Sequence, residues 1–235
     1  MRIVSWNCHY GLNLQKLNTV LEYSPNILLI QECRKNDFDV IKSNWKFKNW
    51  YNDDLNQEES ELGIAIFSNE YKIAFTDIFN RNFRYVVPYF ISNSKCNLTL
   101  FAVWIKPLMI NQSKDYKKPL YNAVKYYYDN KMINNNTLFI GDFNTFAKDE
   151  KGLENLRKNI PPLENGAKNS KENYKETTYY HGKNNYGIDD FCFASNDILK
   201  KIKVSIPKGW DKEKRKDFHW KGLSDHRPII VDINI

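Results

Sequence analysis

The chain has 235 residues, 42% of them hydrophobic and 15% aromatic, which is enough to bury a core within a single domain over residues 1–235. No apolar run approaches the ~20 residues of a membrane-spanning helix, so we expect no membrane association and take a monomer as the default. The net charge of +7 favours a polyanionic partner such as nucleic acid.

The N-terminal residues and the cysteines indicate the cellular compartment. Residues 1–6 form a strand-like run without the charged leader, long apolar stretch and cleavage site of a secretion signal. The four cysteines are far apart, include no Cys-x-x-Cys pair and mostly lie in apolar runs, which is typical of buried free thiols. We therefore expect a cytoplasmic protein.

Short strand-like runs recur along the chain, with few helices between them. The runs are 3–6, 27–31, 63–68, 86–91, 98–104, 137–140, 188–194, 202–206 and 228–233. A leucine stripe over 14–21 has the spacing of a helix and ends before Pro25, and a second apolar stripe follows Pro119. This pattern predicts an α/β domain with a sheet-rich core. The long polar stretches 145–176 and 207–222 are expected to be functional surface loops.

Polar residues stand where these runs begin or end. A polar residue directly follows three of the runs: Asn7, Glu32 and Asp142. If those strands are parallel, the three side chains share one edge of a sheet, where open α/β sheets bind ligands. Asp189 and the pair Asp225-His226 precede runs instead, so antiparallel strands would bring them to the same edge. A mixed sheet, or two packed mixed sheets, would thus gather all of them in one cleft.

Crowded carboxylates at such an edge need a cation, because ionised carboxylates repel each other strongly. Oxygen ligands from Asp and Glu, with no cysteine and no clustered histidine, select Mg²⁺ or Mn²⁺ over Zn²⁺. The sequence therefore predicts a Mg²⁺ or Mn²⁺ site.

Five short motifs lie in order along the chain. They are Trp6-Asn7, Gln31-Glu32, Gly141-Asp142-Phe143-Asn144, Ile188-Asp189 and Ser224-Asp225-His226-Arg227-Pro228. In order and rough spacing they resemble the motifs of the endonuclease/exonuclease/phosphatase superfamily, which includes exonuclease III, apurinic-site endonucleases and deoxyribonuclease I. The resemblance implies a four-layered α/β sandwich, with two mixed sheets face to face and helices outside. It also implies phosphoester hydrolysis by an in-line water.

The resemblance implies a role for each polar residue. Glu32 resembles the principal metal ligand, and Asn7 would support the metal or hold a phosphate oxygen. Asp142 and Asn144 resemble the pair that orients and deprotonates the attacking water. Asp225 would ligate a second metal position or assist the leaving group, with one metal and two both left open. Taken singly, these residues would also fit a strand-end turn, a helix cap or an Asx-turn.

The histidine has an implied partner as well. Asp189, assigned over Asp190 because Ile188 precedes it, resembles the carboxylate that fixes and charges His226. The histidine would then donate to the phosphoryl oxygen as negative charge develops in the transition state.

One position departs from the family pattern. After the run that ends at residue 103, relatives usually place a His or Tyr against the scissile phosphate, whereas this chain has Trp104. An indole donates one hydrogen bond and cannot exchange a proton. Either Trp104 positions the substrate, or Lys106 supplies the phosphate contact, or Trp104 is a core aromatic.

Two further segments are candidates for substrate binding. His181 either approaches the site from a hairpin or is a solvent-facing loop residue. The stretch 207–222 carries six Lys or Arg residues against three Asp or Glu, a local net charge of +3, interleaved with aromatics that include Trp210 and Trp220. Cations follow a phosphate backbone and aromatic rings stack on bases, so this stretch predicts nucleic-acid contact. The alternative is a solvated loop with a hydrophobic anchor.

The leading hypothesis is a Mg²⁺- or Mn²⁺-dependent nuclease that hydrolyses DNA phosphodiester bonds, with RNA a second possible substrate. The same chemistry would also serve a phosphatase for inositol phosphates, phospholipid head groups or nucleotides. A non-catalytic nucleic-acid-binding module is a third hypothesis. The intact set of polar residues argues against it, because an inert descendant would be expected to have lost some of them.

Overall fold

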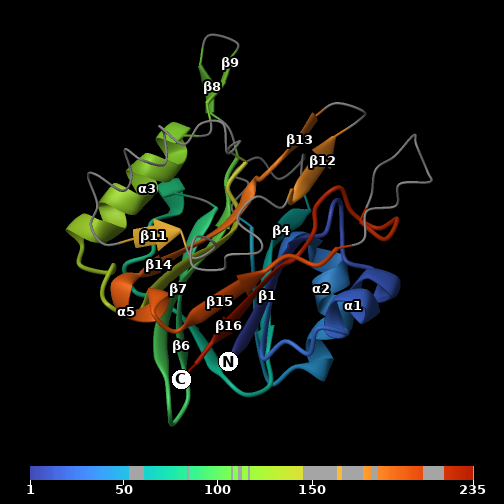
Figure 1. The fold of residues 1–235 in the computed structure, drawn as a ribbon, viewed down its shortest axis with the longest axis horizontal. Helices are drawn as coiled ribbons and strands as arrows, with labels where there is room; N and C mark the ends of the chain where they lie inside the picture. Colours follow the sequence, from blue (N-terminus) through green and yellow to red (C-terminus); the bar gives the residue numbers. More distant parts are fainter. Residues whose placement is uncertain are drawn as a thin grey trace.

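Two mixed β-sheets form the centre of the molecule (Figure 1). The computed structural model describes residues 1–52, 61–83, 85–106, 108–110, 113–115, 117–144, 163–165, 177–181, 185–208 and 220–234. The strands of the first sheet are β1 Arg2–Asn7, β2 Ile27–Arg34, β3 Phe47–Tyr51, β4 Leu62–Ser68, β15 Ile202–Ser205 and β16 Ile229–Ile233, in the order β15-β16-β1-β2-β4-β3. Those of the second are β5 Lys72–Phe75, β6 Val86–Ser92, β7 Asn97–Trp104, β10 Thr137–Asp142, β11 Leu163–Asn165 and β14 Asp190–Ser195, in the order β11-β14-β10-β7-β6-β5.

Helices lie on the outer faces of the two sheets (Figure 1). The helices are α1 Leu14–Leu21, α2 Lys35–Ile41, α3 Lys117–Asp129 and α5 Asn196–Leu199, with 3-10 turns η1 Lys42–Asn44 and η2 Arg81–Phe83. Two small hairpins pair β8 Leu108–Ile110 with β9 Ser113–Asp115, and β12 Tyr179–His181 with β13 Asn185–Gly187. Among the described helices, none has both the length and the apolar character needed to cross a membrane.

Each central strand divides its side chains between two hydrophobic cores. In β1, Ile3 joins the cluster between the sheets, whereas Val4 joins the cluster that packs against α1 and α2. In β10, Ile140 lies between the sheets and Phe139 packs toward α3 in a third cluster. This alternation follows from the two-residue period of a strand. The layers therefore run helix, sheet, sheet, helix, and the predicted four-layered sandwich is confirmed.

The predicted elements and the observed ones agree along most of the chain. Each of the nine strand-like runs overlaps a strand, although 188–194 begins two residues before β14, and the two apolar stripes lie in α1 and α3. The elements that were not predicted include β3, β5, α2 and α5. The strands β3 and β5 are at the edge of each sheet, and their residues are only partly buried. Edge strands lack the continuous apolar pattern on which the prediction of the central strands depends.

The strand directions bring the polar motifs to one edge. β1 runs parallel to β2, and β7 runs parallel to β10, so these four strands end on the same side of their sheets. β14 is antiparallel to β10 and β16 is antiparallel to β1, so both begin where the others end. In this register Asp142 pairs with Asp190 on one side and with Trp104 on the other. The polar residues of the motifs therefore lie together at the C-terminal edge of the parallel strands.

Candidate active site

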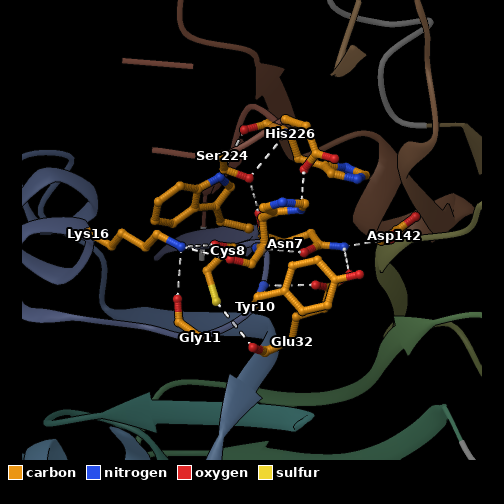
Figure 2. Close-up of polar contacts among 12 residues, drawn as sticks. Asn7, Cys8, Tyr10, Gly11, Lys16, Glu32, Asp142, Ser224 and His226 are labelled. Atoms are coloured by element: carbon orange, nitrogen blue, oxygen red, sulfur yellow. Dashed lines mark hydrogen bonds and ion pairs between the residues drawn. The ribbon is translucent and has the colours of Figure 1, made fainter. Parts of the chain in front are cut away.

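The amide of Asn7 connects the two sheets at this edge. Its Nδ2 donates to Glu32 Oε1 at 3.0 Å, at the end of the neighbouring strand β2. The same Nδ2 donates to Asp142 Oδ2 at 2.9 Å, at the end of β10 in the other sheet (Figure 2). Asn7 is itself buried, with 1% of its surface exposed. One side chain thus fixes the two carboxylates that the sequence assigned to the metal and to the attacking water.

Glu32 owes its orientation to an irregularity in β2. The pairing of β2 with β4 shifts between Ile30 and Cys33, and Glu32 has a left-handed φ of 59°. A bulge of this kind redirects a side chain, and a non-glycine residue at positive φ is strained. The Glu32 carboxylate accepts from Asn7 and, through Oε2, from the backbone N–H of Tyr10 at 2.9 Å. Glu32 remains half-buried, so its carboxylate is at the surface of the site.

Asn144 fixes the carboxylate of Asp142 through two hydrogen bonds. The backbone N–H of Asn144 donates to Asp142 Oδ1 at 2.8 Å, and its Nδ2 donates to Asp142 Oδ2 at 2.9 Å. The same Nδ2 donates to the carbonyl of Ile105 at 3.0 Å. The Asx-turn considered as an alternative is therefore present, and it forms part of the cluster. Burial raises the pKa of Asp142 well above its ordinary value; His226 lowers it, and the charge of Asp190 adds to the rise.

Asp190, rather than Asp189, is the partner of His226. Its Oδ2 lies 2.8 Å from His226 Nδ1, and both side chains are buried. The assignment to Asp189 is therefore wrong. The side chains of β14 alternate, so Asp190 shares the face of Cys192, which lies between the sheets. Asp189 precedes the strand and is out of phase with that face.

The surroundings of His226 favour its charged form. Burial lowers the pKa of His226, but the negative charges of Asp190 and Asp142, together with the hydrogen bond that Nδ1 donates to Asp190, raise it more, so the pKa lies well above the ordinary value. The ring also contacts Tyr179, with 4.7 Å between the ring centroids. These charges favour the imidazolium form of His226, in which both ring nitrogens carry a proton and can donate a hydrogen bond.

Asp189 is a buried carboxylate with one unsatisfied oxygen. Its Oδ1 has no hydrogen-bond partner within the described ranges. Burial, together with the charge of Asp190, raises the pKa of Asp189 from 3.8 to about 7. The hydroxyl of Thr178 accepts from the backbone N–H groups of both aspartates, at 3.0 and 3.1 Å. Thr178 had no role in the sequence prediction, because a threonine within a polar stretch gives no signal of its own.

Asp225 faces His9, a residue left unassigned by the sequence. Asp225 Oδ1 lies 3.1 Å from His9 Nδ1. Burial raises the pKa of Asp225, but the contact with His9 and the charge of His226 outweigh it, so the pKa falls below the ordinary value. Ser224 stabilises the same corner, since its hydroxyl donates to the Asn7 carbonyl at 2.8 Å and accepts from the His226 N–H at 3.1 Å.

The donor set fits a divalent cation. Asp142 and Asp190 each offer a carboxylate oxygen, and these oxygens lie within 4.8 Å of each other and of a ring nitrogen of His226, which in its charged form donates hydrogen bonds and does not bind a cation. Glu32 and Asn7 add oxygen donors at the same edge, in keeping with the preference of Mg²⁺ and Mn²⁺. A cation here would also counteract the burial and the charge of Asp190 that raise the pKa of Asp142, and it would offer the unpartnered oxygen of Asp189 a favourable charge.

Trp104 and Lys106 form a stacked group at the end of β7. Trp104 is buried and packs edge-on against Tyr85, with 5.1 Å between the ring centroids. Lys106 Nζ lies 4.6 Å from the centroid of the Trp104 ring and 4.7 Å from that of Tyr85. Trp104 thus fills a core position, and a cation-π contact holds the Lys106 ammonium beside it.

Of the three further candidates for substrate binding, His181, Trp210 and Trp220, only Trp220 has a described side chain. Trp220 is fully buried, and its ring packs edge-on against Trp6 at a centroid distance of 5.3 Å. A buried indole cannot receive a base, so the prediction for Trp220 is wrong, and the alternative of a hydrophobic anchor applies. Trp210 lies outside the described residues. The backbone of His181 belongs to β12, next to the segment that bridges His226, but its side chain lies outside the described part of the chain.

Solved structures share this fold over the whole chain. No protein-family model matches the sequence, and no curated protein matches it. The Neisseria 3′ phosphatase NExo, bound to a product DNA hairpin, is 15% identical at a TM-score of 0.72, with 100% of both chains covered. TDP2 from D. rerio, complexed with a single-strand DNA product, is 16% identical at a TM-score of 0.70, and the match covers 100% of this chain and 99% of that chain.

A third structure carries the superfamily name. This protein of the endonuclease/exonuclease/phosphatase family, from Leptotrichia buccalis, is 16% identical at a TM-score of 0.67, with 100% of both chains covered. The described strands place the ordered motifs of the sequence at one edge of this same fold. The chain therefore has the fold of the endonuclease/exonuclease/phosphatase superfamily, as its motifs indicated.

Proposed function

We propose that this protein is a divalent-metal-dependent phosphodiesterase that hydrolyses DNA. The observation that carries the proposal is the Asn7 amide, which holds Glu32 and Asp142 together across the two sheets. Beside this pair stands a buried His226–Asp190 pair, in which the neighbouring carboxylates raise the pKa of the histidine and favour its charged form. Two fixed carboxylates and a proton donor at one edge are the groups that hydrolysis of a phosphoester needs.

Each residue then has a task that its contacts support. Glu32 and Asn7 would hold a Mg²⁺ or Mn²⁺ ion, which supplies positive charge against a phosphate oxygen when it is bound. Asp142 would accept a proton from the attacking water, and the two hydrogen bonds from Asn144 keep its carboxylate in one orientation.

The proton donor lies on the other side of the cluster. His226, positioned by Asp190, would donate to the phosphoryl oxygen that gains negative charge in the transition state. Asp225 and its neighbour His9 would stand near the leaving group.

DNA is the substrate that the similar structures and the charge favour. The NExo structure contains a product DNA hairpin and the D. rerio TDP2 structure a single-strand DNA product. The net charge of +7 suits a polyanion. Since NExo is described as a 3′ phosphatase, removal of a terminal phosphate from DNA is the second candidate.

A nuclease assay with a panel of substrates tests the proposal. Purified protein with Mg²⁺ or Mn²⁺ should cleave single-stranded or double-stranded DNA, and EDTA should stop the reaction. Asp142→Asn should lower the rate by at least about 10²-fold, because it removes the base. The matched control is Asp129→Asn, the same change at an exposed position on α3, which should leave the rate unchanged.

The substrates discriminate between the candidates. DNA with a 3′ phosphate, RNA and a small bis-phosphate ester are assayed beside intact DNA. Release of inorganic phosphate without chain cleavage would favour the phosphatase. Hydrolysis of the small ester alone would rule out action on nucleic acid.

A further inference from the structure

The loop of residues 8–11, between β1 and α1, has a backbone that few sequences adopt. His9, Tyr10 and Gly11 have positive φ values of 51°, 56° and 110°. Glycine tolerates this region, but consecutive residues with side chains there are strained and persist only when their surroundings fix them. The loop therefore needs a specific anchor.

Lys16 is that anchor. Its side chain is buried, and Nζ donates to the carbonyls of Cys8, His9 and Gly11 at 2.5, 2.7 and 3.0 Å. These are all three donors of an ammonium group. Figure 2 shows Lys16 reaching the loop from the side opposite Asp142. Burying a charged lysine is unfavourable unless it is fully hydrogen-bonded, so the lysine is well matched to this backbone.

The anchored loop places two rings beside the candidate metal ligands. The N–H of Tyr10 donates to Glu32 Oε2 at 2.9 Å, and His9 lies against Asp225. Tyr10 as a whole residue is 62% exposed, and its ring packs edge-on against His9 with 4.6 Å between the centroids. A large aromatic side chain is thus presented to solvent at the rim of the site, backed by a second ring and held by a strained backbone.

We propose that the ring of Tyr10 is a stacking platform for a nucleobase of single-stranded DNA, next to the phosphate that a cation held by Glu32 would bind. Aromatic rings receive bases in this way because every base has an apolar face. Lys16 is then a positioning residue, since it holds the loop and makes no contact with the base. The choice of ligand rests on the proposed function.

Binding of a fluorescent single-stranded oligonucleotide, measured by anisotropy with Mg²⁺ in an Asp142→Asn background that suppresses cleavage, tests the platform with the cation in place. Tyr10→Ala should raise Kd at least about fivefold, the lower end of the range for base stacking. Tyr10→Phe should bind like the parent, because the ring remains. Tyr128→Ala, which removes an exposed tyrosine from α3, is the matched control and should have no effect.

An oligonucleotide made of abasic residues separates stacking from other contacts. Without bases, the parent and Tyr10→Ala should bind equally. Lys16→Met should reproduce the weaker binding of Tyr10→Ala, and combining the two changes should add little. Thermal unfolding checks that each variant is folded.

Two results would overturn the platform: unchanged binding by Tyr10→Ala, or an equal loss on the abasic oligonucleotide. The proposed function fails separately, if the parent binds DNA through Tyr10 but cleaves no phosphodiester with Mg²⁺ or Mn²⁺. If the protein cleaves DNA but Tyr10→Ala binds the oligonucleotide like the parent, the proposed function stands and the stacking platform fails.

Discussion

Asp189 and Asp190 are adjacent in sequence but differ in what they touch. Asp190 holds the ring of His226 through Nδ1, whereas Asp189 leaves one oxygen without a partner. A carboxylate that accepts a hydrogen bond from one ring nitrogen fixes the orientation of the ring and favours its charged form. Only one of the two aspartates is therefore placed to control the proton donor.

Asp190→Asn should lower the hydrolysis rate by about 10²-fold or more, because the amide no longer stabilises the imidazolium. Asp189→Asn should lower it much less. Steady-state kinetics on a DNA substrate, with the pH profile of both variants, measures the difference. In the pH profile of Asp190→Asn, the rate should begin to fall at a lower pH than in the parent, because the pKa of His226 is lower in the variant. Equal losses in the two variants would contradict the assignment.

The end of β10 must approach β7 closely for Asp142 to reach Asn7. Gly141 has a φ of 142°, and a Cβ at this position would meet the backbone carbonyl oxygen of Val103 and the side chain of Gln31. A backbone contact cannot move aside as a flexible side chain can. Glycine is thus required here by the packing of two parallel strands, and it sets the direction of the next residue.

Gly141→Ala should lower the free energy of unfolding by at least about 3 kcal/mol and should displace Asp142. Gly222→Ala is the control, because its φ is also positive, at 71°, but a Cβ there meets nothing within 4 Å. Gly222→Ala should lower the free energy of unfolding by only about 1 kcal/mol, because a Cβ disfavours the left-handed backbone conformation. Urea unfolding of the two variants gives both values. Similar values for the two would argue against the close approach of β10 and β7.

On the scale of the molecule, several buried charges meet where the two sheets join, and this links stability to pH. Burial, with the charge of Asp190, raises the pKa of Asp189 from 3.8 to about 7. The unfolded chain therefore ionises this carboxyl near pH 4 and the folded protein only near pH 7, so stability falls as the pH rises through this window. At about 1.36 kcal/mol per pKa unit, the loss is at most about 4 kcal/mol.

His226 acts in the same direction. Its pKa is raised in the folded protein, so its stabilising effect is complete below the unfolded pKa of 6.5 and is lost as the pH rises through the folded pKa. Asp225, whose pKa is lowered, changes stability only at more acidic pH.

Thermal unfolding of the metal-free protein should therefore show a lower Tm at about pH 8 than at about pH 5. Asp189→Asn should flatten this dependence and should unfold at a higher temperature than the parent at about pH 8. Mg²⁺ or Mn²⁺ should restore stability to the parent by pairing with the carboxylates. A Tm that rises over the same interval, with no difference in the variant, would contradict this account.

The residue pattern by itself determined the central strands and the edge that holds the site, whereas the four layers were implied by the resemblance of the motifs to a known superfamily. Short continuous apolar runs define the central strands, and a polar residue at the end of such a run identifies its C-terminal end, as at Asn7 and Asp142. Both signals are local, because an apolar run and the polar residue that ends it lie within a few residues of each other.

Only the tertiary structure decided which of two adjacent residues contacts the functional group beside them. The choice of Asp190 over Asp189 depends on the phase of β14 against β10, and a shift of one residue reverses every side chain. The bulge at Glu32, the burial of Trp220 against Trp6, and the anchoring of the 8–11 loop by Lys16 likewise depend on contacts outside the local pattern. Local periodicity carries no information on such contacts, because they are set by the packing of whole elements against one another.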